Sequence, residues 1–468
     1  MEDVKHTTEL FPYQVTGVEF LASKRLALLG DEMGLGKTAQ AIHALLKIEA
    51  KRTLVICPAI ARRNWHAEFK KFSPKTRVFV VESKRDLDKW NKKDTLIISF
   101  TFAPTFLAWV EEKTKTLPRF GALFSCIIID EIHYLKTPTA QRTLSVLGER
   151  GLARYAHRVW GLSGTLMPNH AGELWTILHA FGVVRTKYLS FVKHFCEYYG
   201  GWSPGKRGPY EPLVITGTRK SKIPALRKLL EPVLLRRLSK DVLDLPPLRF
   251  GGVTLSKPEK ISPDLLTDLD LEVVEAQKRL LNVDDISAET LSLLSPSCST
   301  LRRYLGLMKV DTVSELIASE LESESYKKIV LFCCHQGVVV GLRDRLQNFS
   351  PVTLVGKDTA KTRDYNVKYF NHSPKCRVML ANVQAGGIAI NLTSASQVLF
   401  VEQDWCPSVN AQALKRCHRI GQKESVLVRT VSISDSLDDR INEVLQNKME
   451  DISLVLNNVN NEVEPKKL

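Results

Sequence analysis

The chain has 468 residues, of which 44% are hydrophobic and 25% are charged, and this length and balance suit a folded protein with two domains rather than one core. Its nine cysteines include no C-x-x-C pair, which argues against a disulfide framework and a zinc cluster. The sequence also shows no signal peptide and no apolar run of membrane-spanning length. We therefore expect the protein to work in a reducing compartment inside the cell, which is the cytoplasm, the nucleoid or the nucleus. The net charge of +15 fits a polyanionic partner, or a surface that is simply basic.

Short apolar runs of strand length alternate with helical stretches in both halves of the chain. In the first half these runs begin at Arg25, Thr53, Thr95, Cys126 and Arg158. In the second half they begin at Ile329, Pro351, Arg377, Gln397 and Val426. Nearly continuous apolar strands separated by helices are typical of parallel sheets that are covered on both faces. The sequence therefore predicts an α/β protein with two doubly wound parallel-sheet lobes.

The predicted domain boundaries follow from this alternation. We interpret the segments as a first lobe at 1–245 with a helical insertion at 183–245, a linker and helical protrusion at 246–325, a second lobe at 326–450, and a tail at 451–468. The helical pattern after Asp435 predicts an amphipathic helix that closes the second lobe.

The stretch LLGDEMGLGKTAQAI has the order strand, glycine loop, helix. Gly34 and Gly36 allow backbone N–H groups to turn toward phosphate oxygens, Lys37 can reach the terminal phosphates, and Thr38 can ligate magnesium. Asp31 stands where the pattern G-x-x-x-x-G-K-[ST] has glycine, and we interpret its carboxylate as a cap for local N–H groups that braces the outer edge of the loop. A chance glycine turn is the alternative, but strand, loop and helix together favour a phosphate site.

The stretch CIIIDEIHYLKT places two acids at the end of an apolar strand. Asp130 can hold Mg²⁺ at the tip of the strand, and Glu131 can orient and deprotonate an attacking water. The alternative is a pair of solvated acids that opens a turn. The buried strand before them and the loop-bound Lys37 favour the catalytic pair, so the two stretches together predict hydrolysis of a nucleoside triphosphate.

Seven stretches resemble, in the same order, the Swi/Snf-related ATPases of helicase superfamily two. They are FPYQVTGVEFL, DEMGLGKT, DEIHYLKT, GLSGTLMPN, LLRRLSKDV, ANVQAGGIAINLTSAS and ALKRCHRIGQ. The resemblance covers nearly the whole chain and implies two RecA-like lobes, ATP and Mg²⁺ as cofactors, and an aspartate at position 31. The stretches SGTLMPNHAGELW and FCEYYGGW…LLRRLSKDVL are most similar to the annealing-helicase (HARP-type) branch. Ile132, where the family usually has a small residue, and Met167 depart from the family pattern.

The resemblance also assigns residues by their position. The assignments to nucleotide binding are Tyr13 and Gln14, which match the adenine-contact motif that starts at Phe11, together with Gly387 and Gln412. Ser163, Gly164 and Thr165 match the motif that links hydrolysis to lobe movement.

Arg416 and Arg419 match the arginine fingers of the family. Because they are three residues apart, we expect them to share one helical face and to stabilise charge on the transferred phosphate. From spacing alone a solvated basic face would be the better interpretation, and the position in the second lobe favours the fingers. Since Lys37 and Glu131 belong to the other lobe, hydrolysis would require the two lobes to close.

The family tracks along duplex DNA through its phosphates, without reading bases. Basic residues cluster in ARRNWHAEFKKF and RKSKIPALRKLLEPVLLRRLSK, which favours such a partner. The candidate contacts are Arg63, Ser99, Thr393 and Trp405. Trp65 and Trp405 also fit core packing, as large aromatic residues usually do.

The resemblance implies a monomeric DNA-dependent ATPase that binds DNA without sequence preference, moves along the duplex, and remodels forks or anneals strands. Two alternatives stay open. One is a helicase that separates strands of DNA or RNA, and the other is a nucleic-acid-binding scaffold with a vestigial ATPase.

Overall fold

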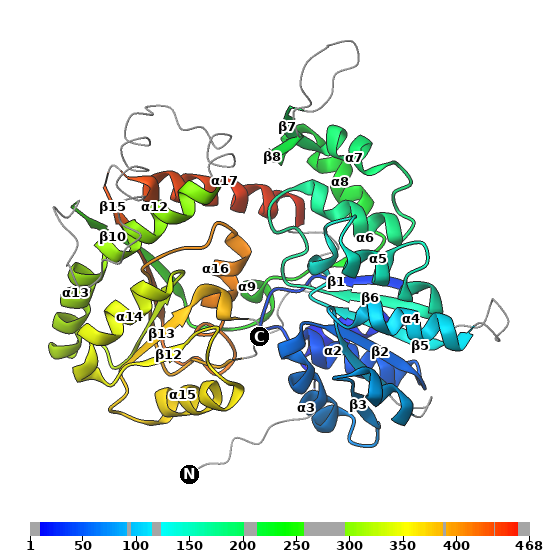
Figure 1. Cartoon of the computed structure of the whole chain (residues 1–468), viewed down its shortest axis with the longest axis horizontal. Coiled ribbons are helices and arrows are strands. Elements are labelled where there is room, and N and C mark those ends of the chain that lie inside the picture. The colour runs from blue at the N-terminus through cyan, green and yellow to red at the C-terminus, as the bar shows by residue number, and fades with distance from the viewer. Residues whose placement is uncertain are drawn as a thin grey trace. The chain divides into compact units, whose positions relative to one another are not determined.

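The computed structural model describes residues 10–90, 95–114, 123–200, 213–256, 295–386, 390–434 and 436–456. The chain divides into two compact units: Met1–Leu243 with Glu450–Leu468, and Asp244–Met449. Figure 1 labels their elements and colours them along the chain. In the described part of the chain, no helix combines the length and the apolar character that crossing a membrane requires.

A seven-stranded parallel sheet forms the centre of the first unit. In spatial order its strands are β3 (Val78–Val80), β4 (Thr95–Ser99), β2 (Thr53–Cys57), β5 (Phe124–Asp130), β6 (Ala156–Leu162), β1 (Leu26–Leu29) and β9 (Leu234–Leu235). Neighbouring strands pair in parallel throughout. All positions of β2 and β4 are buried, which agrees with the apolar runs predicted there.

Helices cover both faces of this sheet (Figure 1). The α-helices described in this unit are α1 (Pro12–Ser23), α2 (Lys37–Lys47), α3 (Arg62–Phe72), α4 (Ala103–Thr114), α5 (Gln141–Leu147), α6 (Trp175–Ala180), α7 (Tyr188–Phe195), α8 (Ile223–Leu230) and α9 (Ser239–Val242). α1, α2 and α3 pack in one core with Val55 and Cys57 of β2, whereas α4, α5 and α6 pack in the other core with Leu54 and Ile56. The alternation of side chains along a strand therefore builds two cores from one sheet.

The insertion predicted to be helical contains strands as well. An antiparallel pair, β7 (Cys196–Tyr199) and β8 (Val214–Thr218), lies between α7 and α8 in the chain. Residues 201–212 lie outside the described residues. β9 then joins the main sheet beside β1, where Leu28 pairs with Leu234. A strand of two residues has too few positions to show a period, so the sequence pattern does not identify it.

A six-stranded parallel sheet forms the centre of the second unit. In spatial order its strands are β10 (Leu248–Leu255), β15 (Val426–Ile433), β14 (Gln397–Phe400), β11 (Ile329–Cys333), β13 (Val378–Asn382) and β12 (Val352–Leu354). We expected only linker and helices at 246–325, and β10 is a strand at the edge of the sheet. Most of its side chains are exposed and it contains Gly251 and Gly252, so no alternation of polar and apolar residues marks it.

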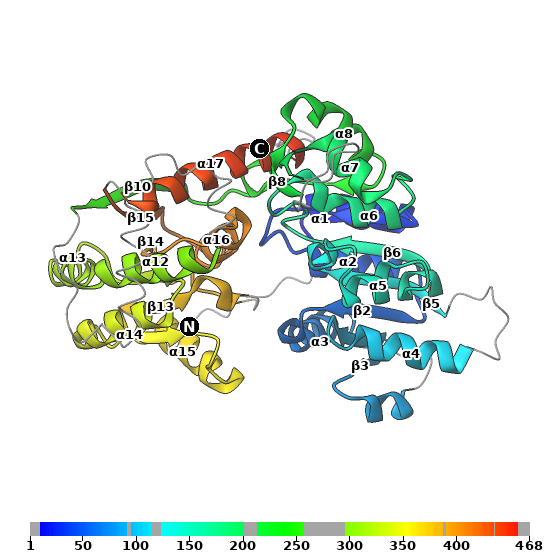
Figure 2. The ribbon, with the colours of Figure 1, turned by 45° about the horizontal axis from the view of Figure 1, so that its top comes forward.

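Helices again cover both faces of the second sheet. They are α12 (Ser295–Met308), α13 (Val310–Glu322), α14 (Gln336–Arg345), α15 (Ala360–His372), α16 (Pro407–Leu414) and α17 (Leu437–Leu456). α12, α13, α14 and the first part of α17 contribute to one core, and α15 and α16 to the other. Figure 2 shows α17 beside β15, as its packing through Ile441 and Leu445 requires. Residues 257–294 of the predicted linker and helical protrusion lie outside the described residues.

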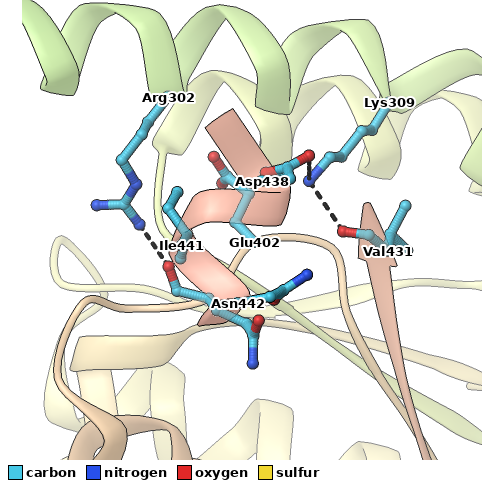
Figure 3. A pocket seen from close by; sticks show the side chains of 8 residues that line it. Arg302, Lys309, Glu402, Val431, Asp438, Ile441 and Asn442 are labelled. Atoms are coloured by element: carbon cyan, nitrogen blue, oxygen red, sulfur yellow. Dashed lines mark hydrogen bonds and ion pairs between the residues drawn. The ribbon is translucent and has the colours of Figure 1, made fainter. Parts of the chain in front are cut away.

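The buried Lys309 joins three elements of the second unit (Figure 3). Its Nζ lies 2.8 Å from the carboxylate of Asp438, in the first turn of α17. It also donates to the carbonyl oxygens of Val401 and Val431, at 3.0 Å each. A buried ammonium group needs such partners, so this side chain fixes the junction of α12 and α13 against α17 and β15.

The last turns of α17 belong to the first unit. Asp451 accepts a hydrogen bond from the backbone N–H of Thr218 at 3.2 Å, and Val455 and Leu456 are buried in the core of that unit. The tail predicted from residue 451 thus starts within a packed helix. Residues 457–468 lie outside the described residues.

Candidate active site

The phosphate loop connects β1 to α2 at the carboxyl edge of the first sheet. Gly34 and Gly36 have φ angles of 88° and 73°, a left-handed backbone conformation that favours glycine. Lys37 is the first residue of α2, and its Nζ donates to the carbonyl oxygens of Asp31 at 2.8 Å and Glu32 at 3.3 Å. The loop therefore has the backbone geometry and the placed ammonium group that phosphate binding requires.

The Lys37 ammonium lies among acidic groups. Burial lowers its pKa, and the charges of Glu131, Asp31 and Asp130 oppose that shift. Thr38 follows in the first turn of α2 and is half-buried. The contacts of Lys37 hold its side chain at the loop, where it can contact a bound polyanion.

The predicted acid pair lies at the end of β5. Asp130 is the last residue of the strand, and Trp65 donates from Nε1 to its Oδ2 at 2.7 Å. Glu131 has a φ of 53°, which is a strained conformation for a residue other than glycine. Such strain concentrates at functional sites, and here it turns Glu131 toward His133 and Ser163.

The two acids have different proton affinities. Burial, together with the charge of Glu131, raises the pKa of Asp130 to about 6. Burial also acts to raise the pKa of Glu131, but the hydrogen bond and charge of His133, the charge of Lys37 and the Ser163 hydroxyl outweigh it and lower that pKa. Glu131 therefore stays ionised and can accept a proton from water.

Ser163 connects this acid to the end of β6. Its Oγ donates to Glu131 Oε2 at 3.1 Å and accepts from the backbone N–H of Thr165 at 3.1 Å. The Nδ1 atom of His133 lies 2.8 Å from the same Oγ. A Cβ on Gly164 would lie 2.6 Å from Cγ of Met33, so only glycine allows this segment to approach the phosphate loop so closely.

These residues fit a magnesium–nucleotide complex. Mg²⁺ prefers oxygen ligands, and the Thr38 hydroxyl and the Asp130 carboxylate would hold it. When bound, the ion would supply positive charge that neutralises the developing negative charge of the phosphates. Lys37 and the glycine loop would hold the phosphates, and Glu131 would orient the attacking water.

The residues assigned to adenine lie beside the phosphate loop. Gln14 accepts from the backbone N–H of Phe11 at 3.0 Å and donates to the Leu35 carbonyl at 3.2 Å. A Cβ on Gly36 would lie 2.4 Å from Nε2 of Gln14. The Tyr13 ring is buried and stacks against Phe11 with centroids 5.8 Å apart, whereas Phe11 is 45% exposed. The exposed aromatic face at this end of α1 thus belongs to Phe11.

Two arginines of the stretch LLRRLSKDV are buried, contrary to our prediction. We counted Arg236 and Arg237 in a basic cluster for nucleic acid, but they are 7% and 4% exposed. Arg237 forms an ion pair with Asp31, and Arg236 donates to the Gly30 and Gly164 carbonyls at 2.9 and 3.0 Å. Both side chains hold the phosphate loop. The signal was the aspartate at position 31, since a buried carboxylate needs a cationic or hydrogen-bonding partner.

Asp31 does brace the loop, but through different donors from those expected. Its carboxylate accepts from the side chains of Arg237 and Gln40, where we expected local backbone N–H groups.

Ile132, which is larger than the residue usual in the family, is fully buried beside a glycine. A Cβ on Gly161 would lie 2.5 Å from Cδ1 of Ile132, so the glycine makes room for the larger side chain.

The two predicted arginine fingers lie in the second unit, beyond the end of α16. The helix ends at Leu414, and residues 415–421 form turns that end at Gly421, with a φ of 102°. The expectation that both arginines share a helical face is therefore wrong. Gln422 holds these turns to the segment after β13 by donating to the carbonyls of Thr393 and Ala395 at 3.2 and 3.0 Å.

Arg416 is 4% exposed, and among the described residues its Nη1 and Nη2 atoms have no hydrogen-bond partner. Burial lowers its pKa to about 10. Arg419 is half-buried and donates from Nη1 to the Ile390 carbonyl at 3.4 Å. Gln412 is half-buried on α16, and Gly387 lies outside the described residues.

The candidate nucleic-acid contacts differ in exposure. Arg63 is exposed on α3, whereas Ser99 is buried at the end of β4 and hydrogen-bonds Thr101 at 2.8 Å. Thr393 and Trp405 are half-buried, and the guanidinium of Arg302 lies 4.9 Å from the Trp405 ring centre. Trp65 is fully buried in the core behind Asp130, which agrees with the packing alternative.

A family model for the SNF2-related domain matches residues 13–254, slightly more than half of the chain. The chain belongs to the SNF2-related family. A second model, for the helicase conserved C-terminal domain, matches residues 308–421. The first match includes the phosphate loop, the acid pair and the segment of Arg236 and Arg237, and the second includes Arg416 and Arg419.

Curated relatives of this SNF2-related protein span nearly all of it. It is 28% identical over 483 residues to an uncharacterized ATP-dependent helicase of Mycoplasma pneumoniae, with 97% of this chain and 42% of the relative covered. It is 27% identical over 462 residues to the DNA annealing helicase and endonuclease ZRANB3 of Mus musculus, with 97% and 41% covered. The chain thus spans less than half the length of these two relatives.

The chain is also similar to a third relative and to a solved structure. A SWI/SNF-related matrix-associated actin-dependent regulator of chromatin subfamily A-like protein 1 homolog of Caenorhabditis elegans is 28% identical over 454 residues, with 94% of this chain and 61% of the relative covered. The Sulfolobus solfataricus SWI2/SNF2 ATPase core in complex with dsDNA has a TM-score of 0.42 at 22% identity, with 96% of this chain and 97% of that chain covered.

Proposed function

We propose that this protein is a DNA-dependent ATPase that moves along duplex DNA. The observation that carries the proposal is the constellation at one edge of the first sheet. There Lys37 lies on the phosphate loop, and Glu131, kept ionised by His133 and Ser163, follows Asp130 at the tip of β5. These residues lie in the part of the chain that matches the SNF2-related domain. One relative of the chain is named an ATP-dependent helicase.

Each residue of the site has a role in this proposal. Lys37 and the N–H groups of the glycine loop bind the phosphates of ATP, and Thr38 and Asp130 hold Mg²⁺. Glu131 orients and deprotonates the attacking water. Arg416 and Arg419, in the second unit, stabilise the charge that develops on the transferred phosphate. The functional boundary between the two lobes lies near residue 245, where the chain passes into the second unit.

DNA is the proposed track. The net charge of +15 suits a polyanion, and relatives carry names such as DNA annealing helicase and DNA excision repair protein. Contacts to phosphates, without base readout, would allow movement along any duplex sequence. We further propose that the movement serves fork remodelling or strand annealing, and the name of the ZRANB3 relatives, DNA annealing helicase and endonuclease, supports the annealing role.

The test is the ATPase rate on a panel of duplexes, forks, single strands and RNA, with a triplex-displacement assay for movement without strand separation. We expect duplex or forked DNA to stimulate hydrolysis most and to support triplex displacement. Stronger stimulation by single strands with robust unwinding would instead identify a strand-separating helicase. If Lys37→Ala and Glu131→Gln leave the hydrolysis rate unchanged, the protein is not this ATPase.

A further inference from the structure

The phosphate loop of this protein has a buried anchor where the usual pattern has glycine. Asp31 is fully buried, and Arg237 donates to its Oδ1 from Nε at 2.9 Å and to its Oδ2 from Nη2 at 2.5 Å. Gln40, on α2, donates to the same Oδ2 at 3.0 Å and to the Leu35 carbonyl at 3.0 Å. The carboxylate thus joins both ends of the loop to one guanidinium group.

The same guanidinium reaches the start of α1. It donates to the Tyr13 carbonyl, and its centre lies 5.4 Å from the Tyr13 ring centre. It also donates to Gln40 Oε1 at 2.9 Å. Arg237 therefore contacts the segment assigned to adenine, the phosphate loop and the helix that follows it.

Backbone pairing aligns these groups. Residues 235–239 continue the pairing of β9 with β1 into the loop. Gly30 donates to the Leu235 carbonyl at 2.7 Å, and Glu32 donates to the Arg237 carbonyl at 2.9 Å. The carboxylate of Glu32 in turn accepts from the backbone N–H of Ser239 at 2.6 Å. The loop is thus held on one side by a segment that is distant in the sequence, since Arg237 and Asp31 are 206 residues apart.

We propose that Arg237 is a positioning residue for the phosphate loop, acting through Asp31, and that it sets the affinity of the site for ATP. The inference rests on the proposed function in that ATP is taken as the ligand of the loop. A buried charge pair loses much when one partner is removed, because the other charge stays buried without compensation. The loop carbonyls and N–H groups would then shift, and small misplacements of binding groups have large effects on ligand contacts.

The test compares four variants in the full chain: Arg237→Gln, Asp31→Asn, the double variant, and Arg158→Gln as a matched control. Arg158 also bonds backbone carbonyls, those of Ala22 and Lys24 at 3.0 and 2.8 Å, but at the opposite ends of the strands. The readouts are the Kd of a fluorescent ATP analogue with Mg²⁺, the KM and kcat for ATP, and the thermal unfolding midpoint.

We expect each single variant at position 31 or 237 to weaken nucleotide binding and raise KM by about 10- to 100-fold, with a smaller change in kcat. The double variant, which removes both buried charges, should recover part of that affinity. Arg158→Gln should lower the unfolding midpoint and leave Kd and KM unchanged.

Two results would overturn the inference. One is a Kd that stays at the wild-type value in both single variants while their unfolding midpoints fall as in Arg158→Gln. The other is a double variant whose loss equals the sum of the single losses, because Arg237 would then not act through Asp31. Failure of the wild-type protein to bind the ATP analogue would instead refute the proposed function, so the two failures are distinguishable.

Discussion

Arg237 in the first unit and Arg416 in the second are equally buried, with 4% of each side chain exposed. Arg237 bonds Asp31, Gln40 and the Tyr13 carbonyl, whereas in the described residues the two Nη atoms of Arg416 have no hydrogen-bond partner. Buried polar groups in native proteins are normally satisfied, and each exception calls for an explanation. Arg237 thus supports the phosphate loop through bonds within the protein, whereas Arg416 has N–H groups without a partner in the described residues, of the kind that a bound phosphate would accept.

Replacing each arginine by methionine tests this contrast directly. Arg416→Met should lower kcat by about 10³- to 10⁵-fold, as loss of an arginine finger does. The same change should raise the unfolding midpoint of the second unit, because it removes a buried charge without partners. Arg237→Met should lower the midpoint of the first unit, because it leaves the Asp31 carboxylate uncompensated. Stopped-flow ATPase measurements give kcat, and calorimetry gives the unfolding midpoints. If the two changes lowered the midpoints equally, the proposed difference between Arg237 and Arg416 would be wrong.

The acid pair provides the next largest effect. Glu131→Gln should lower kcat by about 10²- to 10⁴-fold with little change in KM, because the amide keeps a hydrogen bond with Ser163 but cannot accept the proton of water. Glu173→Gln is the matched control, since this buried acid bonds Lys136 and Asn169. It should lower stability and leave kcat unchanged. A normal kcat in Glu131→Gln, measured at saturating ATP and DNA, would contradict the assigned role.

The ionised carboxylate of Asp130 should lower the stability of the first unit. Its pKa, raised to about 6, means that the folded state disfavours its charged form, so the charge destabilises the first unit at pH values above about 6. Asp130→Asn keeps an acceptor for Trp65 and should raise the unfolding midpoint at pH 7.5 by about 2–4 °C. The difference from wild type should shrink as the pH falls below about 6, where Asp130 gains a proton. If the difference in unfolding midpoint increased at low pH, the pKa of Asp130 would not be raised in the folded state.

The smallest expected effect is at the surface. Arg63→Gln should weaken duplex binding and reduce the slope of log K against log salt by about 1, as loss of one phosphate contact does. Glu82→Gln, an exposed position of the same unit, should not weaken binding. Fluorescence anisotropy at several salt concentrations measures the slope, and an unchanged slope would remove Arg63 from the DNA-contact surface.

Much of the site could be predicted because its parts are local in sequence. The apolar runs at Thr53 and Thr95 form strands, and the glycines at 34 and 36 adopt the left-handed conformations that their loop needs. β10 could not be predicted in the same way, because an exposed edge strand with two glycines has no alternating pattern. The helix expected to carry Arg416 and Arg419 ends before them, since the turns that follow are held by Gln422 from further along the chain.

The strand, loop and helix of the phosphate site and the acids at the tip of β5 follow from local sequence, because neighbouring residues set backbone turns and strand ends. Which arginines face the loop depends instead on contacts between segments that are far apart in the chain. Arg236 and Arg237 look like part of a basic surface in the sequence, and they reach Gly30 and Asp31 because β9 pairs with β1 at the edge of a seven-stranded sheet whose strand order no local pattern encodes. Burial then gives each charge its role, since an arginine that is shielded from water must find a partner in the fold or in a ligand.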